Sequence, residues 1–327
     1  MAKIKALAMF SGGLDSILAI KLIQCQDIEV EALNFSGFFC SCKGNQGILE
    51  SAKRLGVPLK TIEVDERYLR MLRNPKHGYG KNMNPCVDCK IFMLKEAKKY
   101  ANKIGAALVF TGEVLDERPM SQHYPSLRII EEESGLKERL LRPLSARLLP
   151  PTRPEKTGLI DRTKLLGIRG RSRKPQIKLA AEFNITKYPS PAGGCLLTER
   201  DFANRLHDLF QHSKRCSIGD VALLRLGRHF RIGKNKIIVG RNEKENKALI
   251  AGKAKNDYVF ELPEIAGPVT LLQGKKDKKV VQIAAELTVF YSDAQTDSAT
   301  VNFGREKLGR TVNVKVPCRE EVEKLRI

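Results

Sequence analysis

Short apolar runs alternate with longer segments of mixed polarity through the first half of the chain. The run A-L-A-M-F at residues 6–10, for example, has the length and composition of a buried strand. We expect strands at 4–10, 28–35, 59–65 and 107–112. We expect helices at 16–25, 46–56 and 88–104. This alternation indicates βαβ units, and therefore an α/β fold in which a parallel sheet carries helices on both faces.

The pattern changes after about residue 142, where the chain becomes rich in proline and arginine. The segment L-P-P-T-R-P at 149–154 can form neither a helix nor a central strand. Helical spacing returns at 173–184 and 199–211, and short strand-like runs follow at 236–239, 268–272 and 312–316. We therefore expect one domain at 1–211 and a smaller α+β domain with short helices at 212–327.

The segment S-G-G-L-D-S at residues 11–16 joins the first expected strand to the first expected helix. A glycine-rich turn at this place leaves backbone N–H groups free, and with the helix dipole they form a site for phosphates. It is not a Walker loop, because no Gly-Lys-Ser/Thr follows. An ordinary strand–turn–helix connection is the alternative interpretation. The candidate phosphate-binding residues are Ser11, Gly12, Gly13, Asp15 and Ser16.

The net charge of the 327-residue chain is +21, and it is unevenly distributed. Residues 137–178 hold thirteen Lys or Arg against three Asp or Glu, a density that attracts a polyphosphate backbone. A solvated surface is the plainer explanation. Neither a run of 18 apolar residues nor a signal-peptide pattern is present, so we expect a cytoplasmic protein without a membrane span. In a reducing compartment the eight cysteines are expected to be ligands, catalysts or core residues.

Three cysteines stand out by their context. Cys86 and Cys89 open the helix expected near 88–104, where the helix dipole is expected to lower their pKa, and Cys195 follows a Pro/Gly turn. Three thiolates without a fourth protein ligand suit a 4Fe–4S cluster with one open iron, whereas structural zinc takes four ligands. A cluster-free route, in which one cysteine carries a persulfide and another resolves it, is the alternative.

These motifs resemble known families. Residues 11–16 look like the SGGxDS loop of the PP-loop ATP pyrophosphatases, and T-G-E-V-L at 111–115 with S-Q at 121–122 is similar to the 4-thiouridine synthetases of transfer RNA. Two cysteine motifs, N-P-x-x-x-C at 84–89 and G-G-C at 193–195, resemble those of the tRNA 2-thiouridylases. Cys86, Cys89 and a distant third cysteine resemble the cluster ligands of 2-thiocytidine synthetases. The last third, from Gly227 to Asn246, resembles the RNA-binding domain of NFACT-type proteins.

The resemblance implies an ATP-dependent tRNA sulfurtransferase with a PP-loop fold that adenylates a uridine carbonyl and replaces its oxygen by sulfur to give 4-thiouridine. It implies ATP, Mg²⁺ and a 4Fe–4S cluster as cofactors, with tRNA and a sulfur donor (sulfide, a cysteine desulfurase or a sulfur carrier) as partners, and it suggests a homodimer. The implied catalytic residues are Asp15, Cys89 and Cys195. The implied metal ligands are Cys86, Cys89 and Cys195, and Asp15 is expected to hold Mg²⁺. The implied nucleotide-pocket residues are Thr111, Gly112 and Glu113. The expected RNA contacts are Arg169, Arg171, Arg173, Lys174, Arg228 and Arg241.

Departures from these families leave alternatives open. We find no THUMP-like or rhodanese-like segment, so RNA docking is expected from the basic segment and the C-terminal domain, and sulfur from another source. Cys86 stands where the 2-thiouridylases carry an aspartate. The general-base role of that aspartate can therefore not be transferred to this position. Thiolation to 2-thiouridine or 2-thiocytidine, a PP-loop amidotransferase-type ligase, and a non-catalytic RNA-binding iron–sulfur or zinc protein are the other hypotheses.

Overall fold

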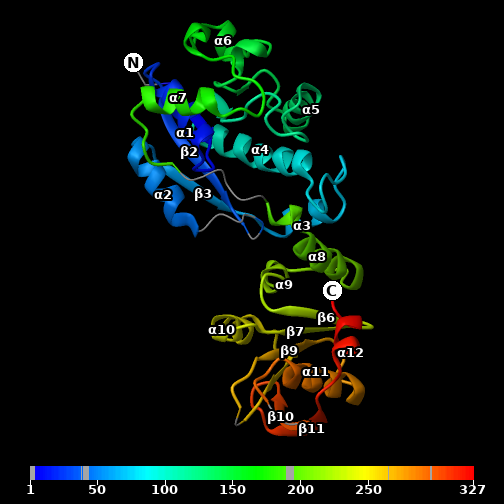
Figure 1. Cartoon of the computed structure of the whole chain (residues 1–327). Coiled ribbons are helices and arrows are strands. Elements are labelled where there is room, and N and C mark those ends of the chain that lie inside the picture. Colours follow the sequence, from blue (N-terminus) through cyan, green and yellow to red (C-terminus); the bar gives the residue numbers. More distant parts are fainter. Residues whose placement is uncertain (1–3, 38, 40–43, 189–194, 264, 295–296) are drawn as a thin grey trace. The chain divides into compact units, whose positions relative to one another are not determined.

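The computed structural model describes residues 4–327 except 38, 40–43, 189–194, 264 and 295–296. It divides into two compact units, Met1–Thr198 and Glu199–Ile327 (Figure 1). The helix expected at 199–211 belongs to the second unit, whereas the expected boundary at 211/212 assigned it to the first. Each unit is described separately below.

The first unit is built on a five-stranded parallel sheet with the order β3-β2-β1-β4-β5. Its strands are β1 (Lys5–Met9), β2 (Glu29–Ser36), β3 (Leu59–Glu63), β4 (Leu108–Thr111) and β5 (Leu140–Leu141). Its α-helices are α1 (Leu14–Gln24), α2 (Gly44–Leu55), α3 (Glu66–Arg73), α4 (Cys86–Lys103), α5 (Tyr124–Ser134), α6 (Arg153–Lys156) and α7 (Lys174–Glu182). Three short 3₁₀ helices are η1 (Ala146–Leu148), η2 (Arg162–Lys164) and η3 (Leu196–Thr198).

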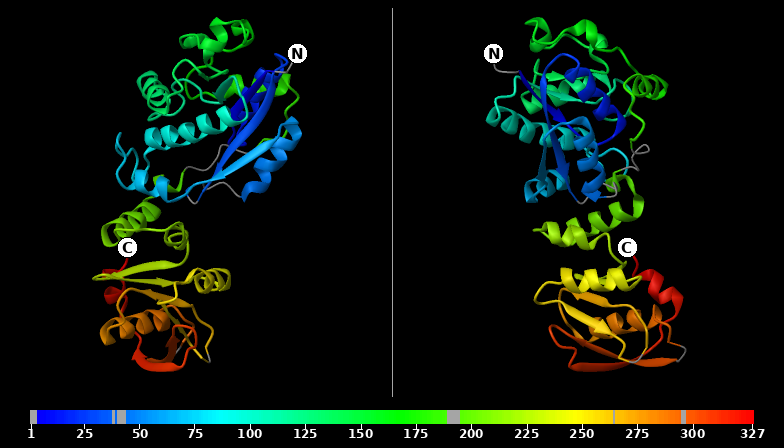
Figure 2. Two further views of the ribbon diagram at one scale, coloured as in Figure 1. Left: turned by 180° about the vertical axis from the view of Figure 1, so that it is seen from behind. Right: turned by 90° about the vertical axis from the view of Figure 1, so that its left-hand side faces the viewer.

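Helices cover both faces of this sheet, as Figure 2 shows. Successive side chains of β1 point to opposite faces. Ala6 and Ala8 pack in one cluster with apolar residues of α1 and α2, whereas Leu7 packs in another with residues of α4 and α5. The predicted α/β fold is therefore confirmed, and the four expected strands match β1 to β4 closely. Burial on both faces explains why β1 and β4 were recognisable as short apolar runs.

The second unit contains a six-stranded antiparallel sheet with the order β11-β10-β8-β9-β7-β6. Its strands are β6 (Arg228–Ile232), β7 (Asn235–Val239), β8 (Tyr258–Glu261), β9 (Thr270–Gln273), β10 (Ser298–Gly304) and β11 (Arg310–Lys315). Its helices are α8 (Arg200–His212), α9 (Ile218–Leu223), α10 (Glu243–Gly252), α11 (Lys278–Phe290) and α12 (Arg319–Lys324).

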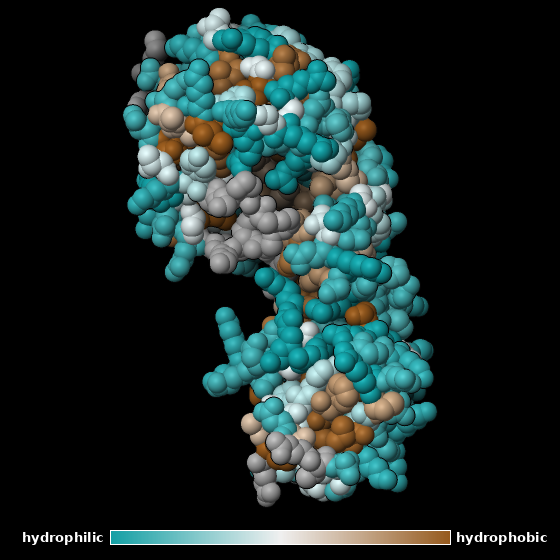
Figure 3. Space-filling view, viewed as in Figure 1, coloured by the Kyte–Doolittle hydropathy of each residue, from teal (hydrophilic) through white to brown (hydrophobic). Residues whose placement is uncertain are grey.

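Neighbouring residues of β7 also separate the two layers of this unit. Ile237 packs in the cluster that contains the apolar side of α11, whereas Ile238 packs with residues of α9 and α10. The expectation of short helices in this part of the chain is wrong for α11, which has 13 residues. Polar residues cover most of the visible face of each unit, and apolar side chains appear there in separate patches (Figure 3).

Candidate active site

The turn between β1 and α1 forms the expected glycine-rich loop at the carboxyl edge of the parallel sheet. Gly12 has a φ of +75°, which an L-residue rarely adopts. Ser16 Oγ donates a hydrogen bond of 2.8 Å to the Gly13 carbonyl, and Ser11 Oγ accepts one of 3.3 Å from the Gly13 N–H. Because α1 starts directly after this turn, the loop presents backbone donors and a positive helix end at one point.

A second turn, after β4, packs directly on the start of α1. A Cβ atom added to Gly112 would lie 2.5 Å from the Asp15 carbonyl carbon and from Ser16 N. No side chain fits there, since the neighbouring atoms belong to backbone that cannot rotate away. The expected nucleotide-pocket residues Thr111 and Gly112 are therefore brought against the loop at 11–16, from a strand almost a hundred positions away in the sequence.

The Asp15 carboxylate is buried in this region without full hydrogen bonding. Its Oδ2 lies 3.9 Å from the Arg173 guanidinium, whereas Oδ1 has no hydrogen-bond partner among the described residues. Burial raises the pKa of Asp15 above its usual value, and the positive charge of Arg173 offsets only part of this effect. A buried carboxylate oxygen without a partner fits a Mg²⁺ ligand, because the cation supplies the missing charge and contact.

The basic segment before α7 reaches this loop as well. Gly170 N donates a 2.7 Å hydrogen bond to the Leu115 carbonyl, and α7 packs on α1 through Ala180, Leu14 and Leu18. Arg173, which we expected to bind RNA phosphates, is therefore positioned beside Asp15. Its partly buried side chain has an Nε without a partner in the described chain, which suits a phosphate of a nucleotide bound in the loop.

Glu117 is a second carboxylate near the loop that the sequence analysis did not identify. The pKa of Glu117 is raised by burial and, to a smaller degree, by the negative charge of Asp15. The charges of Glu117 and Asp15 therefore influence each other. Nothing in the local sequence around Glu117 distinguishes it from a surface residue, so only the fold reveals this pair.

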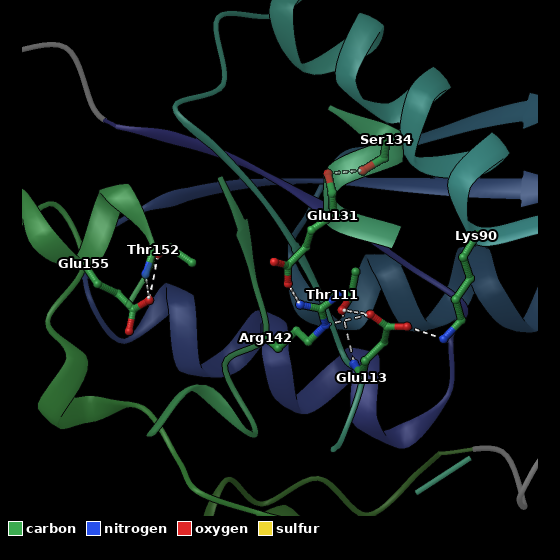
Figure 4. A network of polar contacts seen from close by, with 8 residues as sticks. All are labelled: Lys90, Thr111, Glu113, Glu131, Ser134, Arg142, Thr152 and Glu155. Atoms are coloured by element: carbon green, nitrogen blue, oxygen red, sulfur yellow. Dashed lines mark hydrogen bonds and ion pairs between the residues drawn. The ribbon is translucent and has the colours of Figure 1, made fainter. Parts of the chain in front are cut away.

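Glu113 lies at the centre of a buried ionic network (Figure 4). Its carboxylate forms an ion pair with Lys90, accepts a 3.0 Å hydrogen bond from Arg142 Nε, and accepts one of 3.1 Å from Thr111 Oγ1. Arg142 also pairs with Glu131, and its side chain is only 1% exposed. Burial by itself raises the pKa of Glu113, but the positive charges of Lys90 and Arg142 outweigh it and lower that pKa to about 2.

Both oxygens of Glu113 are thus occupied by protein donors. Glu113, which we expected to line the nucleotide pocket, is held by these contacts beneath the turn that carries Gly112. Arg142 was included in the basic surface segment, but it is buried and paired and cannot contact RNA. The segment's binding surface is therefore smaller than its sequence charge suggests.

The three cysteines gather around one buried tyrosine. The Tyr68 hydroxyl donates a 3.2 Å hydrogen bond to Cys89 Sγ, and burial followed by the charges of Cys89, Cys195 and Cys86 raises the pKa of Tyr68 well above its usual value. Cys86 and Cys89 lie in the first turn of α4, as expected. The structure therefore places Cys86 and Cys89 on one helix start, close enough with Cys195 to affect the same tyrosine, and it adds Tyr68, which no sequence motif marked.

The expected lowering of the cysteine pKa is wrong for Cys89. Burial raises the pKa of the Cys89 thiol to about 11, and the hydrogen bond from Tyr68 does not compensate. Desolvation in the aromatic surroundings formed by Tyr68, Phe39 and Phe92 outweighs the helix dipole. Cys89 is therefore held as a neutral thiol in the absence of a cation or a reaction partner.

The segment that carries Cys195 is tied to the loop before α4. Met83 N donates to the Leu197 carbonyl at 3.1 Å, and Asn82 Nδ2 donates to the Thr198 carbonyl at 2.8 Å. Sulfur donors alone match the ligand chemistry of an iron–sulfur cluster. In the described part of the chain, however, no group of three or more His, Cys, Asp or Glu side chains is arranged to hold a metal ion. The positions therefore do not fit a cluster as they stand.

Asp88 does not serve as a substitute for the aspartate that the 2-thiouridylases carry at the position of Cys86. Its two oxygens accept hydrogen bonds from the backbone N–H groups of Lys76 and His77, at 2.9 and 3.0 Å, and the residue is buried. Asp88 therefore anchors the loop that precedes Cys86. The neighbouring Lys90, in the same part of α4, forms an ion pair with Glu113. The start of α4 therefore connects Cys86 and Cys89 with the network below the glycine-rich loop.

Two family models match the chain. One is described as thiamine biosynthesis protein (ThiI) and matches residues 2–147; the other is described as NFACT protein RNA binding domain and matches residues 227–326. The chain joins a ThiI-family PP-loop domain to an NFACT-type RNA-binding domain. The predicted family is thereby confirmed.

Curated relatives agree with this assignment. The chain is 30% identical over 143 residues to the tRNA-specific 2-thiouridylase MnmA of Acidithiobacillus ferrooxidans. The matched region covers 41% of the chain and 37% of the relative. It is 20% identical to the MnmA of Clostridium botulinum over 94% of the chain and 90% of the relative. It is 27% identical to the probable tRNA sulfurtransferase of Alkaliphilus metalliredigens, over 35% of the chain and 29% of the relative. The chain thus spans little more than a third of the first relative's length.

The expected RNA contacts of the ThiI-family domain differ in their availability. Arg171 and Lys174 are exposed and form no ion pair among the described residues, whereas Arg169 Nε lies 2.6 Å from Asp116 Oδ2. Arg171 and Lys174 are therefore the freer cations. No helix in the described part of the chain is long and apolar enough to cross a membrane.

In the NFACT-type domain, both expected arginines are held by neighbours. The Arg228 guanidinium lies 4.4 Å from the ring centre of Tyr291, and Arg241 Nε hydrogen-bonds both carboxylate oxygens of Glu245 at 3.0 Å. These contacts orient the guanidinium groups and leave further N–H donors for phosphates. The domain therefore presents arginines in defined positions, without the cost of ordering two long side chains on binding.

Proposed function

We propose that this protein is an ATP-dependent tRNA sulfurtransferase that converts a uridine of tRNA to 4-thiouridine. The observation that carries the proposal is the packing of the Gly112 turn on the loop at 11–16, with Cys86 and Cys89 on the helix that is tied to the same turn through the Lys90–Glu113 ion pair. The relatedness to tRNA-thiolation proteins and the RNA-binding domain support the choice of substrate.

In the first step the loop binds ATP, and the uridine 4-carbonyl oxygen attacks the α-phosphorus. The bond to pyrophosphate breaks, and AMP becomes attached to the uridine oxygen. Backbone N–H groups of the loop and the Arg173 guanidinium stabilise the negative charge that leaves with pyrophosphate. Asp15 would hold Mg²⁺, which neutralises phosphate charge when bound.

In the second step a hydrosulfide nucleophile attacks C4 of the adenylated base, and AMP leaves with the original oxygen. N3 loses its proton when the base is adenylated, and the sulfur-bound proton moves to N3 once AMP has left. The carbon–sulfur bond then becomes the thiocarbonyl, so uridine, ATP and hydrogen sulfide give 4-thiouridine, AMP and pyrophosphate without an oxidant. Cys89 and Cys195 hold the incoming sulfur near the base. A cysteine persulfide is the alternative donor, and its use leaves a disulfide that needs a reductant.

A 4Fe–4S cluster on Cys86, Cys89 and Cys195 is what the family resemblance implies, but these positions do not fit one, so no step of the proposal depends on it. Protein purified without oxygen and reconstituted with iron and sulfide is expected to hold no more iron than the C86A variant. A stoichiometric iron content that C86A loses would contradict this and bring the cluster into the proposal.

The deciding experiment is a nucleoside mass analysis after incubation of the protein with ATP, Mg²⁺, sulfide and unmodified tRNA. We expect 4-thiouridine and one AMP per thionucleoside. Cys195→Ala is expected to abolish the product while leaving tRNA affinity unchanged, and Cys25→Ala, at an exposed cysteine outside the site, is the matched control. Full activity of Cys195→Ala would contradict the role of this residue.

Each of the other possible outcomes of this experiment supports a different function. A thionucleoside other than 4-thiouridine would refute the proposed base and retain thiolation. Cleavage of ATP to AMP without any thionucleoside would favour an amidotransferase-type ligase. Tight tRNA binding without ATP cleavage would favour a non-catalytic RNA-binding protein.

A further inference from the structure

One end of the antiparallel sheet in the second unit concentrates positive charge. The strand register brings the start of β8, the end of β9, the end of β10 and the start of β11 to this end. The segments that meet there, 253–258, 273–279 and 304–310, contain nine Lys or Arg and three Asp or Glu. The ion pairs of the described second unit join other residues, so none of these nine cations has a carboxylate partner there.

Three of these cations surround a single tyrosine ring. The charged groups of Lys276, Arg305 and Arg310 lie 5.5, 5.7 and 5.9 Å from the ring centre of Tyr258. They come from the β9–α11 connection, the β10–β11 connection and the first position of β11. Arg310 Nη1 also donates a 3.1 Å hydrogen bond to the Tyr258 hydroxyl. Attraction to the aromatic ring offsets part of the repulsion between the cations, so Tyr258 gathers three like charges at one place.

The three carboxylates at this end do not neutralise the cluster. Asp257 is buried, and its Oδ2 accepts hydrogen bonds from a backbone N–H and a glutamine side chain, at 2.9 and 3.2 Å. Asp277 and Glu306 are exposed and form no ion pair among the described residues. Burial lowers the pKa of Lys276; the charge of Asp257 opposes this effect, and the positive charge of Arg305 adds to it. Lys276 and Arg305 are therefore close enough to repel each other.

The chemistry of this surface selects phosphates and offers nothing to bases. Cations that converge without carboxylate partners attract a polyanion, whose phosphates relieve the repulsion between them. Tyr258 is only 7% exposed, so its ring is not available for stacking on a base. The segments 253–258, 273–279 and 304–310 also contain no large apolar side chain that is exposed. A ligand at this surface is therefore recognised by its charge and not by its sequence.

We propose that this end of the sheet binds the phosphate backbone of RNA without regard to base sequence, with Lys276, Arg305 and Arg310 as its central contacts. The match of residues 227–326 to an RNA-binding domain supports RNA as the polyanion. The inference rests on the proposed function only in taking this RNA to be the tRNA substrate. The second unit then supplies affinity that does not depend on which base is modified.

This surface differs from the one expected from the sequence. Arg228 begins β6 and Arg241 follows β7, and both positions align in register with the start of β9. The cluster around Tyr258 aligns with the end of β9 and therefore lies at the opposite end of the strands. Arg241 is also paired with Glu245, whereas the cluster has no ion-pair partner among the described residues. We therefore expect the cluster to contribute more to phosphate binding than Arg241 does.

The test is a titration of the full chain with unmodified tRNA and with an unrelated double-stranded RNA, at several salt concentrations. The double variant Lys276→Gln with Arg305→Gln removes two charges of the cluster. The double variant Lys214→Gln with Lys315→Gln removes two exposed lysines elsewhere in the same unit and is the control with equal net charge. For the cluster variant we expect the Kd for both RNAs to rise at least about tenfold, and the log–log salt slope to fall by about 0.7–0.9 per cation removed. The control is expected to bind nearly as the wild type does.

Equal Kd values for the two double variants, or a loss of affinity confined to tRNA, would overturn the proposal. Unchanged RNA affinity together with lost binding to phosphatidylserine vesicles would also overturn it and assign the surface to lipid headgroups. If the cluster variant does not fold, Arg305→Gln alone, at an exposed side chain, replaces it and is expected to raise the Kd severalfold. Because the titration needs neither ATP nor sulfide, a negative thiolation assay and a negative result here are separate outcomes.

Discussion

Replacing Glu113 by glutamine tests the buried network most directly. The substitution keeps the shape of the side chain and removes the negative charge that Lys90 and Arg142 share. A shift of the Glu113 pKa from 4.5 to about 2 corresponds to about 3 kcal/mol of stability. Breaking a buried ion pair by removing one partner costs about 3–5 kcal/mol, so two independent estimates agree. We expect E113Q to lower the free energy of unfolding of the first unit by about 3 kcal/mol at pH 7.

The pH dependence follows from the direction of the shift. Because the folded-state pKa is lower than the unfolded-state value of 4.5, the contribution is fully present above pH 4.5 and is lost as the pH falls towards 2. The wild type and E113Q are therefore expected to converge in acid. Urea unfolding followed by circular dichroism at pH 7 and pH 3.5 measures both quantities.

The control is E138Q, which removes an exposed carboxylate paired with Lys156 at 3.0 Å. An exposed pair contributes about 0–1 kcal/mol, so E138Q is expected to unfold almost as the wild type does. A loss below about 1 kcal/mol for E113Q, or an equal loss at both pH values, would refute the assignment of Glu113 as the ionised centre of this network.

Three further substitutions test other parts of the molecule. Gly112→Ala puts a methyl group against the Asp15 backbone, and we expect the Kd for ATP in a binding titration to rise at least about tenfold. Lys236→Met removes an ammonium group whose pKa is lowered by burial to about 8. At pH 7, calorimetry should find the second unit of the variant more stable than that of the wild type by about 3 kcal/mol. This difference should disappear between pH 8 and 10.5, where folding no longer has to bury a charged Lys236. Arg171→Ala should reduce the salt dependence of tRNA binding by about 0.7–0.9 in log–log slope, whereas Arg67→Ala, at an arginine paired with acidic neighbours, should not change it.

Much of the first unit could be predicted because its signals are local. Strands buried on both faces appear as continuous apolar runs, and the loop at 11–16 combines its glycines and polar residues within six positions. The start of α4 was expected two residues late, since its first turn lacks an ordinary capping residue and begins after Pro85. In the second unit, α11 was missed because β-branched residues such as Val280 and Val281 weaken its helical signal, and only packing across the sheet defines it.

The parts of the site that escaped prediction depend on contacts between distant residues. Lys90, Glu113 and Arg142 come from three elements, and no one of them identifies the others in the sequence. The same reason applies to Tyr68, whose position among three cysteines follows from the docking of α3 on α4. Arg173 was recognised as a functional cation, but its partner became apparent only when α7 was seen to pack on α1.

The placement of β1 has a consequence for how the protein is made. This strand is synthesised before the other four strands of its sheet, yet it lies in the middle of the sheet, with Ala6 paired to Leu108 of β4. The loop that follows it gains its Arg173 neighbour only when almost the whole first unit has been synthesised. Until Arg173 has been synthesised, the glycine-rich loop of a nascent chain therefore lacks part of its surroundings. The surroundings of this loop are therefore completed late in synthesis, after most of the first unit is available to fold.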